Sequence, residues 1–315
     1  MTPPSLAKYE ISNKPRAVRS PVLRPVRHCN SNCILKEESD YKIGRVRIEN
    51  LKISVLTATL NAADTVGGLI SSLEEQTDQN FQWVIADGGS TDGTLEKVSN
   101  SAFSLRDVVV DSRVDTGFFS ALNRAIRLAD CDYYLVVGAD DTLTADAIEK
   151  FRHSLLATKP DIFSADVISG SRRVSHRNPR WLWLYGPSAV VSCHSVGTIF
   201  RKDLHEELGF YDETYRIYGD SHFILKALRS GVSVERGDFV VGEFSLEGMS
   251  NNNHLVSFTE HFRAQVECGS SFFLQAALFI MRVVKWRARI VGSWNTHPAS
   301  SQNPARFAAA QEDVP

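Results

Sequence analysis

The sequence is poor in cysteine. Its five cysteines are an odd number and are scattered through a chain of 315 residues, which argues against a disulfide framework and favours a reducing compartment. Cys29 and Cys33 lie beside His28 and could form half of a zinc site, but no second half is visible. We therefore expect a cytoplasmic protein whose fold does not depend on disulfides.

Long apolar runs and a strong net charge are also missing. No stretch reaches the ~18 apolar residues needed to span a bilayer, and the N-terminus lacks the apolar centre of a signal peptide. The formal net charge is −2, so we expect no nucleic acid among the partners. Neither a P-loop nor a Gly-x-Gly-x-x-Gly loop after the first strand is found, which argues against P-loop NTPases and standard dinucleotide-binding folds.

The first 49 residues differ in composition from the rest of the chain. Five prolines and six arginines fall among them, and no helical or strand periodicity persists. Such a segment is typical of a mobile tail. We predict a basic tail at 1–49, a main domain at 50–260, a helical extension at 261–297 and a flexible tail at 298–315.

From residue 51 onward, short apolar runs alternate with segments of helical spacing. Predicted strands cover 51–60, 81–86, 108–110 and 133–137, and predicted helices lie near 66–73, 95–99, 118–129 and 145–156. This order predicts an α/β fold with a mostly parallel central sheet and helices on both faces. After residue 159 the alternation weakens, and we expect a strand at 161–169, a polar turn at 172–177 and helices at 202–208 and 222–228.

Carboxylates follow three of the predicted strands. The pairs are Asp87 with Asp92, Asp111 with Asp115, and Asp140 with Asp141. In an open parallel sheet the ligand lies beyond the carboxyl ends of the strands. Several carboxylates at one edge repel one another unless a cation lies among them, and oxygen ligands of this kind suit Mg²⁺ or Mn²⁺. The pattern predicts a metal–diphosphate site. The alternative for the third pair is a helix cap.

Five segments, taken together and in order, resemble glycosyltransferase family 2 with its GT-A fold. They are residues 57–61, 84–94, 115–126, 137–143 and 209–220. The similarity extends from residue 51 to about 231, and the Asp-Gly-Gly-Ser form at residue 87 is most similar to enzymes that build bacterial exopolysaccharides, capsules and O-antigens. The resemblance implies a mixed sheet with a Rossmann-like nucleotide-binding half.

The resemblance also implies roles for residues on the donor side. Thr57, Thr59 and Asn61 would line the nucleotide pocket, and Asp87 would accept a hydrogen bond from a uracil ring. Asp115 and Asn123 would border the donor, Asp140 would contact ribose or the donor sugar, and Asp141 would bind the metal. Two alternatives stay open: Asp87 as a turn residue and Asn123 as a helix residue with internal partners.

On the acceptor side, the resemblance implies that Asp220 is the catalytic base. The family often has an aromatic residue after this aspartate, whereas this chain has Ser221. The alternative is that Asp220 caps a helix beginning at His222. His194 would lie near the acceptor, and His254 would belong to a loop that closes over the donor or would add a metal ligand.

The apolar run at 272–281 is followed by four basic residues up to 289. It fits either an amphipathic helix on a membrane surface or a helix packed on protein.

The expected activity is transfer of a sugar from a nucleotide-sugar donor, with a UDP-sugar as the favoured donor, to a saccharide or lipid-linked acceptor. The transfer would invert the anomeric carbon and would use Mn²⁺ or Mg²⁺ as cofactor. The enzyme would be cytoplasmic or peripheral on the inner face of the plasma membrane. One alternative is a nucleotidyltransferase, although residues 57–64 hold no Lys or Arg for a triphosphate. The other is a non-catalytic protein that binds nucleotide sugars.

Overall fold

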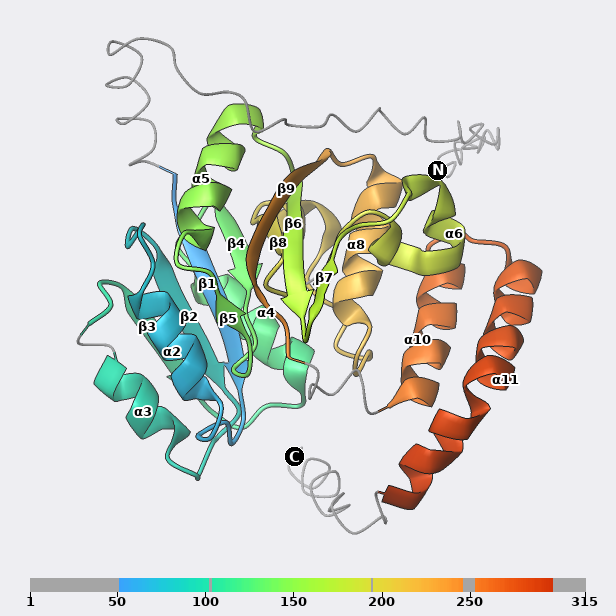
Figure 1. Ribbon diagram of the computed structural model, residues 1–315, viewed down its shortest axis with the longest axis horizontal. Helices are drawn as coiled ribbons and strands as arrows, with labels where there is room; N and C mark the ends of the chain where they lie inside the picture. The colour runs from blue at the N-terminus through green and yellow to red at the C-terminus, as the bar shows by residue number, and fades with distance from the viewer. Residues whose placement is uncertain (1–50, 102–103, 194, 246–252, 297–315) are drawn as a thin grey trace, which may run out of the picture.

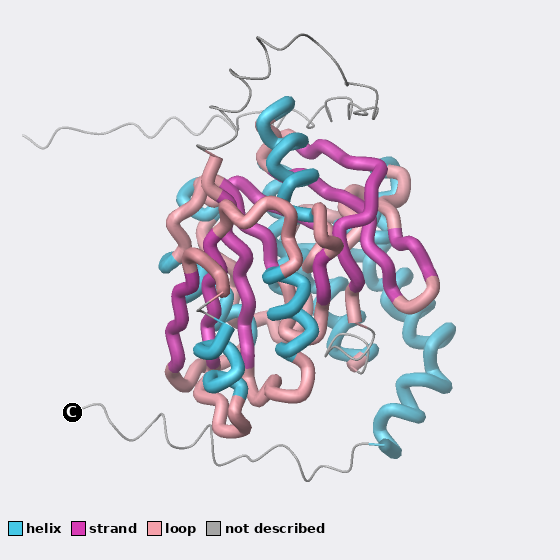
Figure 2. The backbone as a smooth tube through the Cα atoms, turned by 60° about the vertical axis from the view of Figure 1, so that its left-hand side comes forward, coloured by secondary structure: helices cyan, strands magenta, loops and turns pink. Residues whose placement is uncertain are grey.

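The computed structural model of the protein describes residues 51–101, 104–193, 195–245 and 253–296. The two predicted tails, at 1–49 and 298–315, lie outside the described residues. Within these ranges the chain forms a nine-stranded sheet with helices on both faces (Figure 1, Figure 2). The predicted α/β fold with a mixed sheet is confirmed.

The first half of the sheet is parallel. Its strands are β1 (Ile53–Thr59), β2 (Gln82–Asp87), β3 (Val108–Ser112) and β4 (Tyr133–Val136). They are ordered β3-β2-β1-β4, and every neighbouring pair in this half runs parallel. The carboxyl ends of these strands therefore share one edge of the sheet, as the sequence predicted.

Side-chain alternation along the central strands divides the core into two layers. Val55 of β1 packs with α2 (Val66–Glu74), α3 (Thr94–Ser101) and α5 (Ala147–Thr158) on one face. Leu56, the next residue, packs with α4 (Phe118–Leu128) and α8 (Gly219–Ser230) on the other face. Both faces are buried because helices cover both, which is why these strands read as continuous apolar runs.

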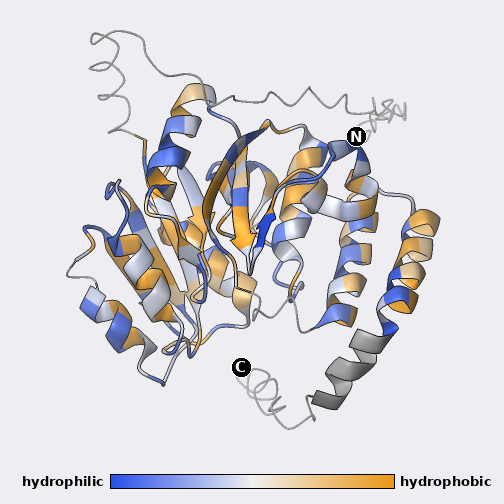
Figure 3. Ribbon diagram, viewed as in Figure 1, coloured by the Kyte–Doolittle hydropathy of each residue, from blue (hydrophilic) through white to orange (hydrophobic). Residues whose placement is uncertain are grey.

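The second half of the sheet is mixed. It continues as β8 (Thr198–Arg201), β6 (Ile162–Ser169), β9 (Val234–Glu243) and β5 (Thr142–Leu143). The polar turn predicted at 172–177 is wrong in its first part, because Arg172–Val174 forms strand β7 and pairs antiparallel with β6. Arg172 and Arg173, two of the three residues of β7, are hydrophilic and exposed, so this segment carries little apolar signal for a strand (Figure 3).

The C-terminal part is helical and adds to the α8 side of the molecule. Helix α10 (His254–Glu267) packs on α8, and α11 (Phe272–Thr296) packs on α10 (Figure 1). The predicted boundary at 260 falls inside α10. Among the helices of the described residues, none combines the length and the apolar character needed to cross a membrane.

Short helices complete the same side. They are η1 (Pro179–Trp181), α6 (Leu182–Tyr185), η2 (Gly186–Ala189) and α7 (Leu204–Leu208).

Candidate active site

The loop after β2 is organised around Asp87. This residue is fully buried, and its carboxylate accepts hydrogen bonds from Thr59 Oγ1 (3.0 Å), Ser112 Oγ (2.7 Å), the N–H groups of Gly89 and Ser90 (both 2.9 Å) and Ser90 Oγ. Burial alone would raise the pKa of Asp87, but the donors outweigh it and hold the pKa below its usual value.

These contacts join the ends of β1, β2 and β3. A carboxylate has about four lone-pair sites, and five protein donors already address Asp87. The uracil contact predicted for Asp87 would therefore have to displace one of them. The hydrogen bonds from Gly89 and Ser90 match the alternative interpretation, in which Asp87 stabilises the turn after β2.

The loop after β1 is fixed to the loop after β2. Asn61 Oδ1 accepts the N–H of Thr91 at 3.0 Å, and the N–H of Asn61 donates to Ser90 Oγ at 2.8 Å. Thr57 is fully buried and accepts the indole N–H of Trp83 at 3.0 Å, so its hydroxyl group supports the core. Of the predicted nucleotide-pocket residues on β1 and its loop, Asn61 is the exposed one.

Asp115 faces the loop after β2 from the next loop along the sheet. Its Oδ2 lies 3.0 Å from the position that a Cβ on Gly88 would take, so the carboxylate fills the space that the glycine leaves. Arg124 Nη2 lies 3.3 Å from Asp115 Oδ2 and also donates to the backbone oxygen of Asp87 at 3.0 Å. Partial burial raises the pKa of Asp115, and Arg124 opposes that shift.

Arg124 was missed by the sequence prediction. It also pairs with Asp111 at 3.2 Å and so holds the loops after β2 and β3 together. Its sequence signal is no more than a basic residue between the buried helix positions 123 and 125.

Asn123 is committed to the protein interior. Its amide nitrogen donates to Tyr211 O and Glu213 Oε1, both at 2.9 Å, and its oxygen accepts the N–H of Tyr211 at 3.0 Å. It is 1% exposed. The contacts match the alternative that Asn123 is a satisfied helix residue, which ties α4 to the segment before α8.

The Asp140–Asp141 pair follows β4, as predicted, and its two members have different surroundings. Asp141 is buried and accepts hydrogen bonds from Ser195 Oγ (3.0 Å) and the N–H groups of Gly138 (3.0 Å) and Ser245 (2.9 Å). Burial raises the pKa of Asp141, the bond from Ser245 opposes this, and the neighbouring Asp140 adds to it. Asp140 is exposed.

Both carboxylates turn toward the same point. A Cβ on Gly138 would lie 2.8 Å from Asp141 Oδ2 and 2.9 Å from Asp140 Oδ1. Within the described ranges there is no cluster of three or more His, Cys, Asp or Glu that could hold a metal ion. Mg²⁺ at phosphate-transfer sites is commonly held by one or two carboxylates together with substrate phosphates. The Asp140–Asp141 pair fits this kind of incomplete protein ligand set.

Asp220 lies in the first turn of α8, which begins at Gly219 and not at His222. It is 4% exposed. The alternative placed Asp220 as the cap before a helix starting at His222, whereas Asp220 lies inside the helix. A carboxylate in a first turn is stabilised by the positive end of the helix dipole.

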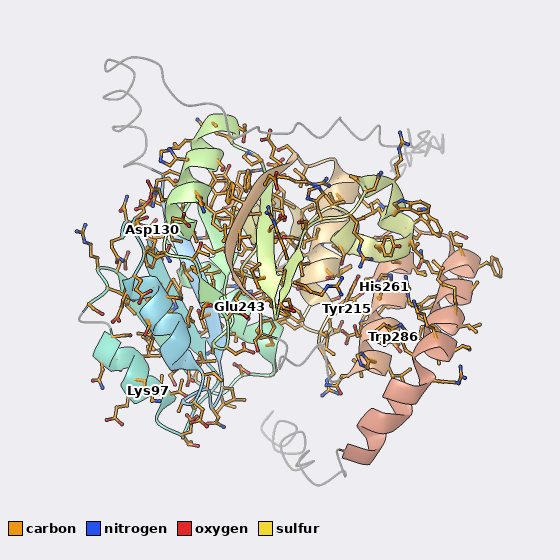
Figure 4. The ribbon with its side chains drawn as sticks, in the orientation of Figure 1. Lys97, Asp130, Tyr215, Glu243, His261 and Trp286 are labelled. Atoms are coloured by element: carbon orange, nitrogen blue, oxygen red, sulfur yellow. The ribbon has the colours of Figure 1, made fainter. Side chains whose placement is uncertain are left out.

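The segment before Asp220 is held by helix α10, which sequence reasoning did not connect with the site. The Glu260 carboxylate accepts the N–H groups of Arg216 (2.8 Å), Ile217 (2.9 Å) and Tyr218 (2.9 Å). The Tyr218 hydroxyl group lies 2.7 Å from His261 Nδ1, and Figure 4 places His261 where α10 faces α8. Glu260 carried no signal in the sequence beyond being a glutamate between apolar helix positions.

A cavity of about 210 Å³ lies beside the first turns of α8. It is lined by residues of η2, the segment after it, α8 and the end of β9: Pro187, Ser188, Val191, Ser192, Cys193, Ser221, Ile224 and Phe244. Ser221 follows Asp220, and Phe244 precedes the residue that donates to Asp141. Asp220 is thus the chain neighbour of one cavity residue, and Asp141 is bonded to the chain neighbour of another, while none of the three aspartates lines the cavity itself.

Of the two histidines predicted for the site, the structure describes one. His194 lies outside the described residues. His254 begins α10, and its ring packs near Phe258 (6.3 Å between centroids) and Trp286 (5.4 Å), so the described contacts place it between α10 and α11. The loop at 248–250 with which it was associated lies outside the described residues.

Comparison with known families identifies the class of protein. The family model "Glycosyl transferase family 2" matches residues 54–224, a span that includes the strand-end carboxylates and Asp220. The chain belongs to this family, so the predicted glycosyltransferase identity is confirmed.

Two relatives with a function in their names each share 26% identity with the chain. A PGL/p-HBAD biosynthesis glycosyltransferase of Mycobacterium bovis is 26% identical over 256 residues, covering 75% of this chain and 97% of the relative. A poly-beta-1,6-N-acetyl-D-glucosamine synthase of Staphylococcus aureus is 26% identical over 182 residues, covering 53% of this chain and 44% of that protein.

Two solved structures are similar in fold. S. aureus TarS 1-349 in complex with UDP-GlcNAc has a TM-score of 0.57 at 15% identity, covering 78% of this chain and 80% of that one. The mannosyltransferase PcManGT from Pyrobaculum calidifontis, in complex with GDP-Man and Mn²⁺, has a TM-score of 0.57 at 16% identity, covering 86% of each chain. These similarities confirm the GT-A fold.

Proposed function

We propose that the protein transfers a sugar from a nucleotide-sugar donor to a hydroxyl group of a saccharide or lipid-linked acceptor, with inversion at the anomeric carbon. The observation that carries the proposal is the placement of a single carboxylate and a carboxylate pair on two different elements. Asp220 lies in the first turn of α8, next in sequence to the cavity residue Ser221, and the Asp140–Asp141 pair follows β4, with Asp141 bonded to Ser245, next in sequence to the cavity residue Phe244. An inverting transfer needs this division, with a base on the acceptor side and a charge-compensating site at the leaving group.

In the proposed reaction, Asp220 accepts the proton of the acceptor hydroxyl group. The oxygen of that group attacks the anomeric carbon, and the bond from that carbon to the nucleoside diphosphate breaks. The leaving group departs with the electron pair on the side opposite to the attack. Asp220 is suited to this role because it is buried in the first turn of α8, next in sequence to the cavity residue Ser221.

Asp140 and Asp141 would hold Mn²⁺ or Mg²⁺. A cation bound there supplies positive charge to the departing diphosphate. Asp141 has about one acceptor site left after its three hydrogen bonds, and Asp140 is exposed. The cation bound by PcManGT supports this assignment by analogy of fold.

We assign the base contact of the donor to Asp115 rather than to Asp87. Asp115 accepts hydrogen bonds from two protein groups, the N–H of Gly117 and Arg124, and so keeps acceptor capacity beside Gly88, whereas five protein donors address Asp87. A carboxylate can accept the N3–H of uracil or the N1–H and amino group of guanine, and the donors bound by TarS and PcManGT carry these two bases. We favour uracil, as the resemblance implied.

The acceptor belongs, in this proposal, to the synthesis of a surface glycan or glycolipid. The names of the mycobacterial and staphylococcal relatives support such a setting. The family match favours sugar transfer over nucleotidyl transfer, because the matched region includes both proposed halves of the site.

The test is release of nucleoside diphosphate from a panel of UDP- and GDP-sugars, with Mn²⁺, with Mg²⁺ and with a chelator. We expect cation-dependent release from one donor class, reduced at least about a hundredfold by Asp220→Asn and by Asp141→Asn. Glu243→Gln, at an exposed carboxylate close in sequence to the cavity residue Phe244, is the control and should retain activity. Donor binding without release in the unaltered protein would favour the non-catalytic alternative and overturn the proposal.

A further inference from the structure

We propose that helices α6 and α11 form a docking surface for an anionic lipid bilayer. On α6 and the residue before it, Trp181, Trp183 and Tyr185 are 46%, 38% and 38% exposed. On α11, Phe273, Ile280 and Val284 are 84%, 61% and 54% exposed. These six residues define the α6–α11 surface.

The two parts of this surface are adjacent in the fold. Gln275 of α11 donates a side-chain hydrogen bond to Trp183 O at 2.7 Å, and Arg282 donates to Leu184 O. Figure 1 shows α6 beside the upper part of α11. The exposed rings therefore border the exposed side of the long helix.

Helix α11 has one face that packs on protein and an opposite face with exposed apolar side chains. Gln275 and Leu278 are buried, and the ring centroids of Trp286 and Phe258 of α10 lie 6.3 Å apart. Phe273, Ile280 and Val284 follow the seven- and four-residue spacing of a single helix face. One side of the helix thus packs on protein, while the other presents large apolar side chains to the outside.

The charge around the α6–α11 surface indicates which kind of partner binds there. The whole chain carries a net charge of −2, yet residues 167–202 and 268–311 contain no aspartate or glutamate at all. These segments hold six and five Lys or Arg residues. Four of these basic residues are exposed next to the α6–α11 surface: Arg177, Arg180, Lys285 and Arg287. A partner that meets this surface therefore gains by being negatively charged.

A bilayer with anionic headgroups fits better than the other candidates. A second copy in a two-fold dimer would bring the same cationic surface against itself. A nucleic acid would meet the arginines and rings but not the aliphatic face of α11. Trp, Tyr and basic residues around an apolar helix face are the composition of helices that lie in the membrane interface.

The surface also leads to the candidate active site. Helix α6 continues directly into η2, whose Pro187 and Ser188 line the same cavity as Ser221, the residue after Asp220. Docking through α6 would place the cavity close to the headgroups. This last step rests on the proposed function and implies that the acceptor hydroxyl group is carried on a lipid.

The experiment is flotation of the full chain with vesicles of phosphatidylcholine alone or with about 30 mol % phosphatidylglycerol, an anionic lipid. We expect binding to the anionic vesicles that weakens with salt. Trp181→Ala/Trp183→Ala, Phe273→Ser/Ile280→Ser and Lys285→Glu/Arg287→Glu should each lower the partition coefficient at least about tenfold. Leu128→Ser, which removes an exposed leucine at the end of α4, should not.

The proposal is overturned if the protein does not float with anionic vesicles at low salt, or if the three double variants bind as the unaltered protein does. A change of mass in solution in these variants, without loss of flotation, would identify a second copy as the occupant and also overturn it. Flotation needs no donor, so an inactive protein that binds vesicles would fail the proposed function and keep the docking surface.

Discussion

Glu260 Oε2 accepts the backbone N–H of Tyr218 at 2.9 Å, two residues before Asp220. The same carboxylate accepts two further N–H groups, from Arg216 and Ile217. A carboxylate is a pure acceptor, so it can satisfy three backbone donors at once. Helix α10 thereby sets where α8 begins and where Asp220 is placed.

Replacing Glu260 by glutamine should lower kcat about tenfold and leave the KM for the donor nearly unchanged. The amide introduces two N–H donors opposite backbone N–H groups, which disrupts the geometry, and small displacements of a base cost rate steeply. Steady-state kinetics with the donor varied separates the two constants. Glu267→Gln, on the same helix and bonded to Tyr215 and Arg263, is the matched control. A donor KM that rises as much as kcat falls would contradict a positioning role.

The start of α8 also depends on a close approach between Gly219 and Phe119. A Cβ at position 219 would lie 2.8 Å from the Phe119 ring, so Gly219→Ala should destabilise the fold by about 1–3 kcal/mol and reduce activity. Adding Phe119→Leu should recover part of both losses, because the smaller side chain makes room. Denaturant melts and initial rates of the single and double variants measure this.

Gly67→Ala serves as the comparison for that substitution. Gly67 lies in α2, and a Cβ there would meet nothing within 4 Å beyond its chain neighbours and the backbone of its own helix. Alanine at this position should therefore stabilise the fold by about 0.5–1 kcal/mol through helix propensity. If Phe119→Leu fails to improve Gly219→Ala in either measurement, contact with that ring is not the cause of the loss.

The sequence predicted the site residues that lie at the ends of strands with a clear apolar pattern. Strands β1, β2 and β4 are short apolar runs buried on both faces. Asp87 is the last residue of β2, and Asp141 lies in the loop after β4. Such features are local, so spacing alone predicts which edge of the sheet carries the carboxylates.

The rest depends on contacts between distant segments. Nothing near Glu260 indicates that its partners are the N–H groups of 216–218, more than forty residues earlier. In the same way, the five donors to Asp87 come from three strand ends, and this convergence decides that Asp87 is filled while Asp115 is not. Strand β9 was also missed, because its burial is irregular along ten residues and its register with β6 shifts twice.

Asp115→Asn should raise the KM for the nucleotide donor about tenfold with little change in stability. One good hydrogen bond to a charged acceptor contributes about 1.5–3 kcal/mol, and an amide can satisfy only part of it. Asp87→Asn should have the reverse profile, with a clear loss of stability, because it leaves buried donors of the β2 loop without acceptors. Donor titrations and thermal melts of both variants provide the comparison. If Asp87→Asn alone raised the donor KM while the melting temperature stayed unchanged, the base contact would belong to Asp87.

Stability should fall as the pH drops below 6.5, and His205 should account for part of the fall. Its ring is buried against Phe223 and lies 2.7 Å from the Tyr134 hydroxyl group. Burial lowers the pKa of His205 to about 4 from its ordinary value of 6.5. Between these values the unfolded chain takes up a proton that the folded protein does not. Acidification therefore favours unfolding by about 1.4 kcal/mol per pH unit for one such histidine.

His205→Gln should make the decline in unfolding free energy between pH 6.5 and pH 4 shallower by about one proton, even if the variant is less stable at neutral pH. Part of the remaining slope belongs to His261, whose pKa is lowered by burial to about 3, and part to carboxylates with a lowered pKa, such as Glu267. His153→Gln removes an exposed histidine and should leave the slope unchanged. Urea melts at several pH values give the slopes, and equal slopes in the unaltered protein and His205→Gln would mean that His205 is protonated in the folded state, contrary to its burial among aromatic rings.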